Sequence, residues 1–271
     1  MKQKEIHEII SGHLSAMKKV YDKIIADFDL DDIHDFRVEV KKLRAFLRLL
    51  NADHKPDKPT IPKRLKMFYG YAGIVRNIQL HRHILLKNLA DNKIERPEEY
   101  DKMLNVEEDY WKKKAIEWRE ENDIQKKEDK IIKRKPDALR KSAVKKFVAN
   151  KKNELSRQLH NVSTDEAMHH VRKILKDLVY TNEYIKDEAD LPATIAAKEH
   201  LKMLTDWLGD FMDKCIQIDF LSHEYISPLR NETEKIVLNR FREQVMSEKE
   251  AIKEKLTPHF HELFRELSSE C

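Results

Sequence analysis

Apolar residues recur along most of the chain at spacings of three and four positions, which is the period of a helix that buries one face. Prolines and helix-capping residues interrupt this period repeatedly. The pattern predicts helices near residues 2–27, 31–52, 62–90, 97–131, 137–159, 164–187, 193–225 and 228–267, the last of which is expected to break before Pro258. The predicted fold class is all-α.

The composition agrees with this prediction. The 271 residues are 38% charged and 40% hydrophobic, a mixture typical of amphipathic helices with solvated outer faces. Only four glycines occur, whereas a sheet protein of this length needs more of them in its turns. Because the formal net charge is only +4, any anion-binding site must arise from local clustering of cations.

The cysteines and the apolar runs predict a cytoplasmic location. Cys215 and Cys271 lack the spacing of a disulfide framework, which favours free thiols in a reducing compartment. No apolar run approaches the roughly 20 residues that cross a bilayer. The N-terminal segment lacks the apolar region of a signal peptide. We therefore expect no membrane partner.

Two short patterns occur twice, at a spacing close to half the chain length. Residues 34–42 have the order His-x-x-Arg-Val-x-x-Lys-Lys, and residues 169–177, which begin 135 positions later, have the order His-x-x-Arg-Lys-x-x-Lys-Asp. Residues 73–77 align in the same way with residues 209–213, at an offset of 136. Two matches in the same order and at nearly the same spacing predict that a four-helix unit is duplicated. The two copies are expected to join near Pro136, the midpoint of the chain.

The first copy of the longer pattern predicts a stripe of cations on one helix face. Successive residues of an α-helix turn by about 100°, so four cations fall within about 80° of His34. These cations are Arg37, Lys41, Arg44 and Arg48, and the residues on the opposite face are Phe36, Val40, Leu43, Leu47 and Leu50. The cations repel one another at such spacings, and nothing in the first half of that face supplies matching acids.

The second copy predicts the same geometry. The residues that share its face are His169, Arg172, Lys173, Lys176 and Tyr180. Two like-charged stripes that face one cleft would concentrate positive potential and favour a polyanion. Arginine can bind phosphate oxygens through two hydrogen bonds, lysine supplies a point charge, and histidine supplies a further donor.

The same cations are compatible with other partners. An acidic protein surface or a nucleic-acid backbone would also bind a basic cleft. We find no recognised nucleic-acid-binding motif and no basic stretch interleaved with exposed aromatic residues, so we do not expect sequence-specific binding of nucleic acid. A phosphate-dependent enzyme is a further alternative, and it would need carboxylates that converge with the histidines.

A metal site is the main alternative for the two repeated histidines. Asp31 and Glu166 each precede one of them by three residues, as in helical di-metal proteins. Helix capping explains these acids as well, because residues 163–166 have the order of a capping box, with Ser163 as the N-cap. Asp29, Asp31 or Asp32 could similarly cap the start of the helix predicted over residues 31–52.

Two other histidine pairs are not expected to bind a metal. His81 and His83, like His259 and His261, are two positions apart, so their side chains diverge on a helix. We expect all four to be surface residues. We therefore predict neither a metal nor a cofactor for this chain.

Four segments resemble the signatures of a known family. HDFRVEVKKLRAFLRLL (34–50) and MHHVRKILKDLVYTNE (168–183) resemble the two main signatures of the CHAD family, the conserved histidine α-helical domain. AGIVRN (72–77) resembles its Gly-x-x-Arg-Asp element, and LGDFMD (208–213) resembles its Leu-Gly-x-x-x-Asp element. The segments lie in the order and at the spacing of the family. The resemblance covers essentially the whole chain.

The sequence departs from the family pattern at two positions. Asn77 stands where the family usually has Asp, so the ion pair of that Asp with an arginine is not expected here. Val179 stands where the second signature usually has Arg, so the second stripe has one charge fewer.

The resemblance implies two four-helix bundles, here residues 1–135 and 136–271, related by a pseudo-two-fold axis with a basic cleft between them. It implies binding of inorganic polyphosphate without catalysis, and association with polyphosphate granules or with a polyphosphate-metabolising enzyme. The binding residues that we predict are His34, Arg37, Lys41, Lys42, Arg44, Arg48, Arg76, His169, Arg172, Lys173, Lys176 and Tyr180, of which Arg76 is taken from the family pattern. Lys63, Arg64 and Lys66 are further candidates from their position alone.

Overall fold

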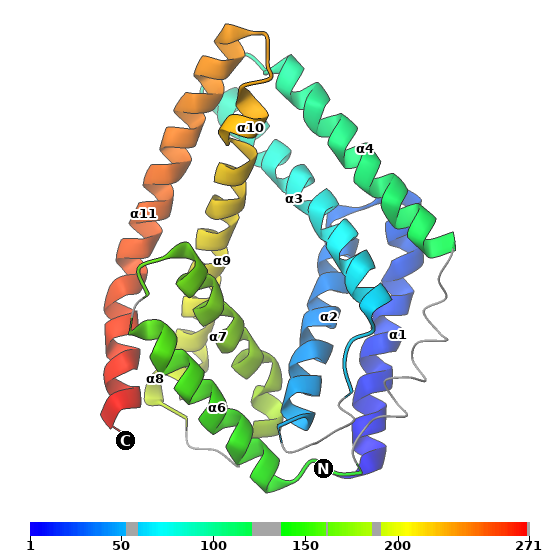
Figure 1. The fold of residues 1–271 in the computed structure, drawn as a ribbon, viewed down its shortest axis with the longest axis vertical. Helices are drawn as coiled ribbons and strands as arrows, with labels where there is room; N and C mark the ends of the chain where they lie inside the picture. The colour runs from blue at the N-terminus through cyan, green and yellow to red at the C-terminus, as the bar shows by residue number, and fades with distance from the viewer. Residues whose placement is uncertain (53–58, 121–136, 161, 186–190, 270–271) are drawn as a thin grey trace.

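The structure, a computed structural model, describes residues 1–52, 59–120, 137–160, 162–185 and 191–269, and within these ranges it forms helices and no β-strand (Figure 1). The long helices are α1 (Gln3–Asp27), α2 (Leu30–Leu50), α3 (Lys63–Asp91), α4 (Glu98–Glu120), α6 (Lys141–Leu159), α7 (Asp165–Ile185), α9 (Lys198–Phe220) and α11 (Glu232–Ser269). The helices α8 (Ala193–Ala196) and α10 (His223–Ile226) are single turns. The predicted all-α class is confirmed.

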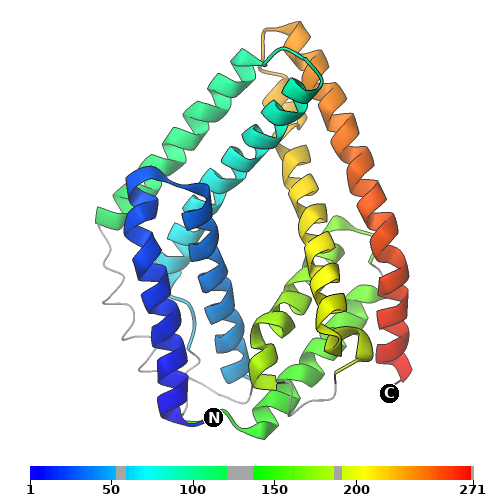
Figure 2. The same cartoon turned by 180° about the vertical axis from the view of Figure 1, so that it is seen from behind.

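The long helices pack in pairs, and four of them form a closed ring. α1 packs on α2, α4 on α3, α6 on α7, and α11 on α9. The inner members contact one another in the order α2, α7, α9, α3 and back to α2, so they surround the centre of the molecule. Figures 1 and 2 show α2 and α7 converging at one end of this ring and α3 and α9 converging at the other. We call α2, α3, α7 and α9 the central ring.

Short polar side chains start the two repeated helices. Asp29 caps α2, since its carboxylate accepts hydrogen bonds of 2.9 and 3.0 Å from the backbone N–H groups two and three positions later. At α7 the Thr164 hydroxyl oxygen accepts a 3.1 Å hydrogen bond from the backbone N–H of Ala167. The residue that caps α7 is therefore Thr164, one position after the predicted Ser163.

Two predicted helices differ from the observed ones. The helix predicted over 193–225 is interrupted at Ala197, which is extended with ψ of 97°, and this divides it into α8 and α9. The break predicted before Pro258 is wrong, because α11 runs through this residue. Pro258 is exposed, and the Thr257 hydroxyl donates to the carbonyl of Lys253 at 2.9 Å. Residues 121–131 of the predicted fourth helix, and the predicted division at 135/136, lie outside the described residues.

In the part of the chain that the structure describes, the hydrophobic core has two clusters, and each contains residues from both halves of the chain. In the first, Phe36 and Phe68 belong to the same cluster as Phe211 and Phe260. The second cluster contains Leu85, Leu89, Tyr100 and Leu104 together with Phe220, Leu238, Phe241 and Val245. The two halves thus bury apolar surface jointly, and their packing holds the central ring closed.

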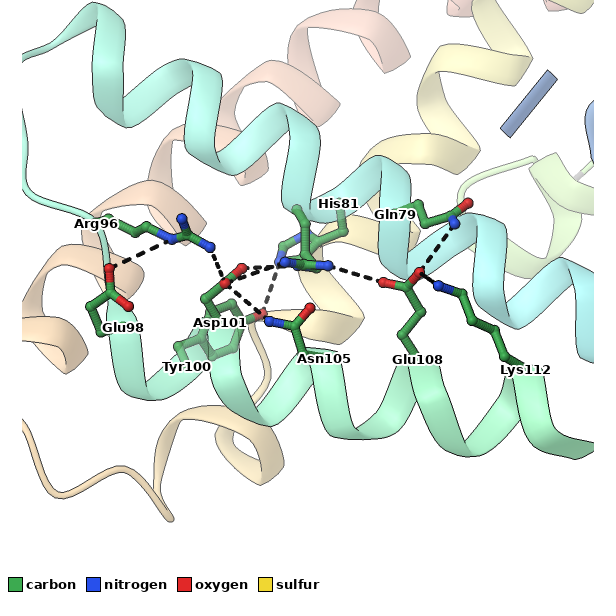
Figure 3. A network of polar contacts seen from close by, with 10 residues as sticks. Gln79, His81, Arg96, Glu98, Tyr100, Asp101, Asn105, Glu108 and Lys112 are labelled. Carbon is green, nitrogen blue, oxygen red and sulfur yellow. Dashed lines mark hydrogen bonds and ion pairs between the residues drawn. The ribbon is translucent and has the colours of Figure 1, made fainter. Parts of the chain in front are cut away.

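A buried polar network fixes α4 against α3 (Figure 3). Arg82 of α3 donates to Asp101 at 2.9 Å and to Glu108 at 3.0 Å, and both acids belong to α4. Gln79 of α3 donates to Glu108 at 3.1 Å, and Lys112 lies 2.7 Å from the same carboxylate. Since both acids are buried, the network satisfies charges that would otherwise be costly to desolvate.

His81 is a core residue, so its predicted surface position is wrong. It is buried, its Nε2 lies 2.8 Å from the Tyr100 hydroxyl, and its ring stacks on Phe220 at 5.0 Å. The Tyr100 hydroxyl donates to the carbonyl of Phe220 at 2.7 Å, so it accepts from His81. Burial lowers the pKa of His81 from 6.5 to about 4, which keeps the ring neutral. His83 is exposed, as predicted.

Candidate functional site

Cations from three helices of the central ring lie close enough to Lys41 to act electrostatically on its amine. Arg37 lies on α2 with Lys41, Arg76 lies on α3, and Arg172 and Lys176 lie on α7. Burial, and then repulsion by these four cations, lowers the pKa of Lys41 from 10.5 to about 7. We call these five residues the basic cluster. Cations of both predicted stripes therefore influence the same lysine amine.

Several donors at this place have no acceptor within the protein. In the described part of the chain, the Nε atoms of Arg44, Arg76 and Arg172 are buried and make no hydrogen bond, and neither does Nδ1 of His169. A buried donor without a partner costs about 1–3 kcal/mol.

Tyr69 of α3 holds the arginines of α2 in place. Arg37 Nη1 donates to the Tyr69 backbone carbonyl at 2.7 Å, and its guanidinium lies 4.2 Å from the centre of the Tyr69 ring. Arg44 lies 5.0 Å from the same ring. Cation–π contacts of this kind stabilise an arginine in a fixed orientation. Tyr69 therefore orients two cations of the first stripe.

The two repeated glycines differ in how closely an arginine approaches them. A Cβ atom at Gly73 would lie 1.9 Å from Arg37 Nη1, whereas a Cβ atom at Gly209 would lie 3.5 Å from Arg172 Nη2. The first distance is a severe overlap, and the second is an ordinary contact. Gly73 is therefore required by the position of Arg37, and Gly209 is not required by Arg172.

Gly73→Ala and Gly209→Ala should consequently have opposite effects on the free energy of unfolding. Gly209→Ala should raise it by about 0.5–1 kcal/mol, since alanine favours a helix interior. Gly73→Ala should lower it by about 1–2 kcal/mol, because Arg37 must leave its hydrogen bond to Tyr69. Urea unfolding followed by circular dichroism measures both values, and equal stabilisation by the two variants would contradict the close approach of Arg37.

The two repeated histidines occupy equivalent positions in their helices. Each lies four residues after the first residue of its helix, His34 in α2 and His169 in α7. Burial, and then repulsion by Arg76 and Lys41, lowers the pKa of His34. Burial and the cations of its own helix lower the pKa of His169. Both rings are therefore neutral at pH 7, and each can donate one N–H to an anion.

Two further side chains lie within electrostatic range of the basic cluster. Asp213 of α9 is accessible to solvent, but the surrounding protein limits its hydration and raises its pKa, while Arg172 and Arg76 act in the opposite direction. Burial also raises the pKa of Tyr180, which lies near both Arg172 and Tyr69. With Asp213, all four helices of the central ring contribute to the site.

Arg48, at the end of the first stripe, pairs with an acid from the other half of the chain. Its Nη1 donates to both oxygens of Asp177 on α7, at 2.7 and 2.8 Å. Lys151 of α6 lies 3.0 Å from the same carboxylate, which is only 7% exposed. Arg48 therefore joins α2 to α7 in this structure.

The remaining predicted residues are exposed, contact other side chains or line a separate cavity. Lys42 donates to Glu39 at 2.7 Å, and Glu39 also contacts His13 at 2.7 Å. Lys173 is exposed on α7. The residues that line a cavity of about 340 Å³ beside the first stripe are Arg44, Leu47, Arg48, Asn51, Pro59, Thr60, Ile61 and Lys66. Lys63 and Arg64 are exposed in the first turn of α3.

Sequence reasoning did not select Tyr69, Asp177 or Asp213 as parts of the site. Tyr69 carries no local signal, because its contacts with α2 depend on how α2 and α3 pack. Asp177 ends the second repeated pattern, where Lys42 stands in the first, and this difference in charge could have drawn attention to it. Asp213 aligns with Asn77 in the repeat, and this acid at a repeated position could have marked it as part of the site.

The geometry gives little support to a metal site at the two repeated histidines. Among the described residues, groups of three or more potential metal ligands do not include His34 or His169. Burial lowers the pKa of Arg76, and the nearby carboxylates of Asp213 and Asp31 act in the opposite direction. In the described part of the chain, every helix is too short or too polar to span a membrane.

An all-α ring of helices that joins the two repeated helices, α2 and α7, defines the class of this protein. The model of the CHAD domain matches residues 8–222, and the chain therefore belongs to the CHAD family. Binding of polyphosphate is the general property of that family. No curated protein matches the sequence.

Solved structures with the same fold support this assignment. The CHAD domain from the plant Ricinus communis has a TM-score of 0.72 and 14% sequence identity, with 98% of this chain and 92% of that chain covered. PptA from Streptomyces chartreusis has a TM-score of 0.69 and 12% identity, with coverage of 96% and 99%. The fold similarity thus extends over α10 and α11, which lie beyond the residues matched by the family model.

Proposed function

We propose that this chain binds inorganic polyphosphate at the centre of the central ring, without catalysing a reaction on it. The observation that supports the proposal is the convergence of the basic cluster on Lys41 from both halves of the chain. Five cations packed this closely repel one another, and a polyanion would remove that repulsion. Arg37, Arg76 and Arg172 offer guanidinium groups to phosphate oxygens, and Lys41 and Lys176 add charge.

The proposal extends along both stripes. His34 and His169 would donate near the helix N-termini, where backbone groups also favour anions. Arg44 contacts the Tyr69 ring and also lines the cavity that Lys66 borders. The bound polyphosphate could therefore continue from the basic cluster toward this cavity. Many contacts along one polymer would raise the affinity with chain length.

We further propose that the site arose by duplication of a four-helix unit, with residues 1–135 and 136–271 as its copies. The packing of α1 on α2 corresponds to that of α6 on α7, and the packing of α3 on α4 corresponds to that of α9 on α11. Each copy contributes two helices to the central ring. Cytoplasmic location, association with polyphosphate granules, and a partner enzyme of polyphosphate metabolism stay predictions.

A titration of the purified protein with long-chain polyphosphate tests the proposal. Triphosphate, single-stranded DNA and an acidic peptide serve as competing ligands, each at two salt concentrations. We expect binding that tightens with polyphosphate length and weakens with salt. Equal affinity for the acidic peptide or for DNA would favour the alternative partners. Failure of the folded protein to bind polyphosphate would overturn the proposal.

The affinity for polyphosphate should depend on pH through Lys41. Its pKa of about 7 in the free protein means that the amine is largely neutral above pH 8. A bound polyanion favours the ammonium form, so binding above pH 7 must take up a proton. The logarithm of the affinity should therefore fall by up to about one unit per pH unit between pH 7.5 and 9.

Calorimetry in two buffers with different ionisation enthalpies measures this proton uptake directly. Lys41→Arg is the matched variant, because a guanidinium stays charged over the whole range. We expect the variant to bind without the pH-dependent loss of affinity. The same slope in the variant and the wild type would assign the proton to another group.

A further inference from the structure

A second group of ligand-type side chains lies between α9 and α11, away from the basic cluster. His200 is near the start of α9, and His259 and Glu262 are three positions apart on α11, so they share one side of that helix. The three potential ligand atoms lie within 4.8 Å of one another. His259 is half-buried in this contact, so it is less exposed than a fully solvated surface residue.

The histidine pair has a spacing that suits a shared ion. Nε2 of His200 lies 3.1 Å from Nδ1 of His259, and the two rings are nearly perpendicular. Two imidazole nitrogens bound to one tetrahedral zinc ion, each at about 2.0–2.1 Å, lie about 3.3 Å apart. The two rings can therefore share either one hydrogen or one metal ion with little movement.

We propose that His200, His259 and Glu262 bind a zinc ion that joins α9 to α11. Two imidazoles and one carboxylate are a ligand set that zinc accepts, and water would fill the fourth position. Glu262 is exposed, so its carboxylate is free to rotate toward the ion and the site is open to solvent. This proposal concerns residues outside the polyphosphate site and does not depend on the proposed function.

The position of the site in α11 gives the ion a structural role. His259 directly follows Pro258, which lacks the backbone N–H that would continue the helical ladder. A zinc ion at this point would fasten the C-terminal part of α11 to α9 beside the one residue of α11 that cannot donate a backbone hydrogen bond. It would thereby stabilise the part of the core that contains Phe260 and Leu263.

Calorimetric titration of chelator-treated, dialysed protein with Zn²⁺ tests the proposal. We expect one equivalent to bind and the melting temperature to rise with zinc concentration. His200→Ala and His259→Ala should each weaken binding at least about 100-fold, and Glu262→Gln by about 10-fold. His261→Ala is the matched control, because this exposed histidine on the same helix should have no effect.

Cu²⁺ gives an independent readout through Trp207, whose ring lies 5.5 Å from that of His259. A copper ion at the site should quench the Trp207 fluorescence, and Trp207→Phe should remove this quenching without preventing the binding of zinc. Melting curves without metal show whether each variant is folded. Absence of zinc binding by the wild type, or an equal loss in His261→Ala, would overturn the proposal.

Discussion

Replacement of Arg37 and Arg172 together by glutamate is expected to lower the affinity for long-chain polyphosphate by about 1000-fold. Each arginine lost from a charged hydrogen bond costs about 1.5–3 kcal/mol, and the new carboxylates repel the polymer as well. The two residues stand at equivalent positions of the repeat and both lie near Lys41, so the double variant alters the site from both sides.

The single variants separate binding from folding. Arg37 is held by Tyr69, so its replacement also removes a hydrogen bond within the protein. Arg172 has a buried Nε without a partner, so Arg172→Glu should reduce affinity with little loss of stability. Lys18→Glu with Arg240→Glu is the matched control, since it makes the same change in net charge at exposed positions of α1 and α11.

Filter binding or fluorescence titration at one fixed salt concentration measures these affinities. The control variant should bind within about twofold of the wild type, because exposed charges far from the ligand are screened. If the control lost as much affinity as the double variant, the interaction would depend on net charge instead of on the central ring.

Asp177→Ala is expected to lower the free energy of unfolding by about 2–3 kcal/mol. Asp177 is 5% exposed, and its carboxylate contacts both Arg48 of α2 and Lys151 of α6. Removal of the acid leaves Lys151 partly buried beside a second cation, which is more costly than the loss of a surface ion pair. The partial exposure of Arg48 keeps the expected loss below that of a fully buried network.

Urea unfolding measures this loss, and Asp206→Ala is its matched control. Asp206 forms an exposed pair with Lys202 one turn away on α9, so its removal should change the stability by no more than about 0.5 kcal/mol. Equal effects of the two variants would show that the Arg48–Asp177 contact does not hold α2 against α7.

The local features of this chain follow from its sequence. Apolar residues at helical spacing place Phe36 and Val40 in the core, and they place Arg37 and Lys41 on another face of the same helix. Asp29 caps α2 because a carboxylate at that position can accept from the next free backbone N–H groups. Such features involve residues within a few positions of one another, so the order of residue types is sufficient to predict them.

Errors at the local level arose where tertiary contacts outweighed local preference. His81 is polar enough for the surface, but a hydrogen bond to Tyr100 and stacking on Phe220 satisfy it in the core. Pro258 is a helix breaker, but the packing of α11 on α9 and its own exposure allow the helix to continue. In both cases the decisive partner is distant in the sequence or on another helix.

The sequence by itself determined the helices, the repeat at half the chain length, and the face of each repeated helix that carries cations. Only the tertiary structure decided that Arg172 and Lys176 influence Lys41, that Arg48 is joined to Asp177, and that Tyr69 orients Arg37. The same is true of the contact between His200 and His259. These residues are 59 positions apart in the sequence, but Nε2 of His200 lies 3.1 Å from Nδ1 of His259. The physical reason is that the spacing of residues on one helix is fixed by backbone geometry, whereas contacts between helices depend on which apolar faces pack together.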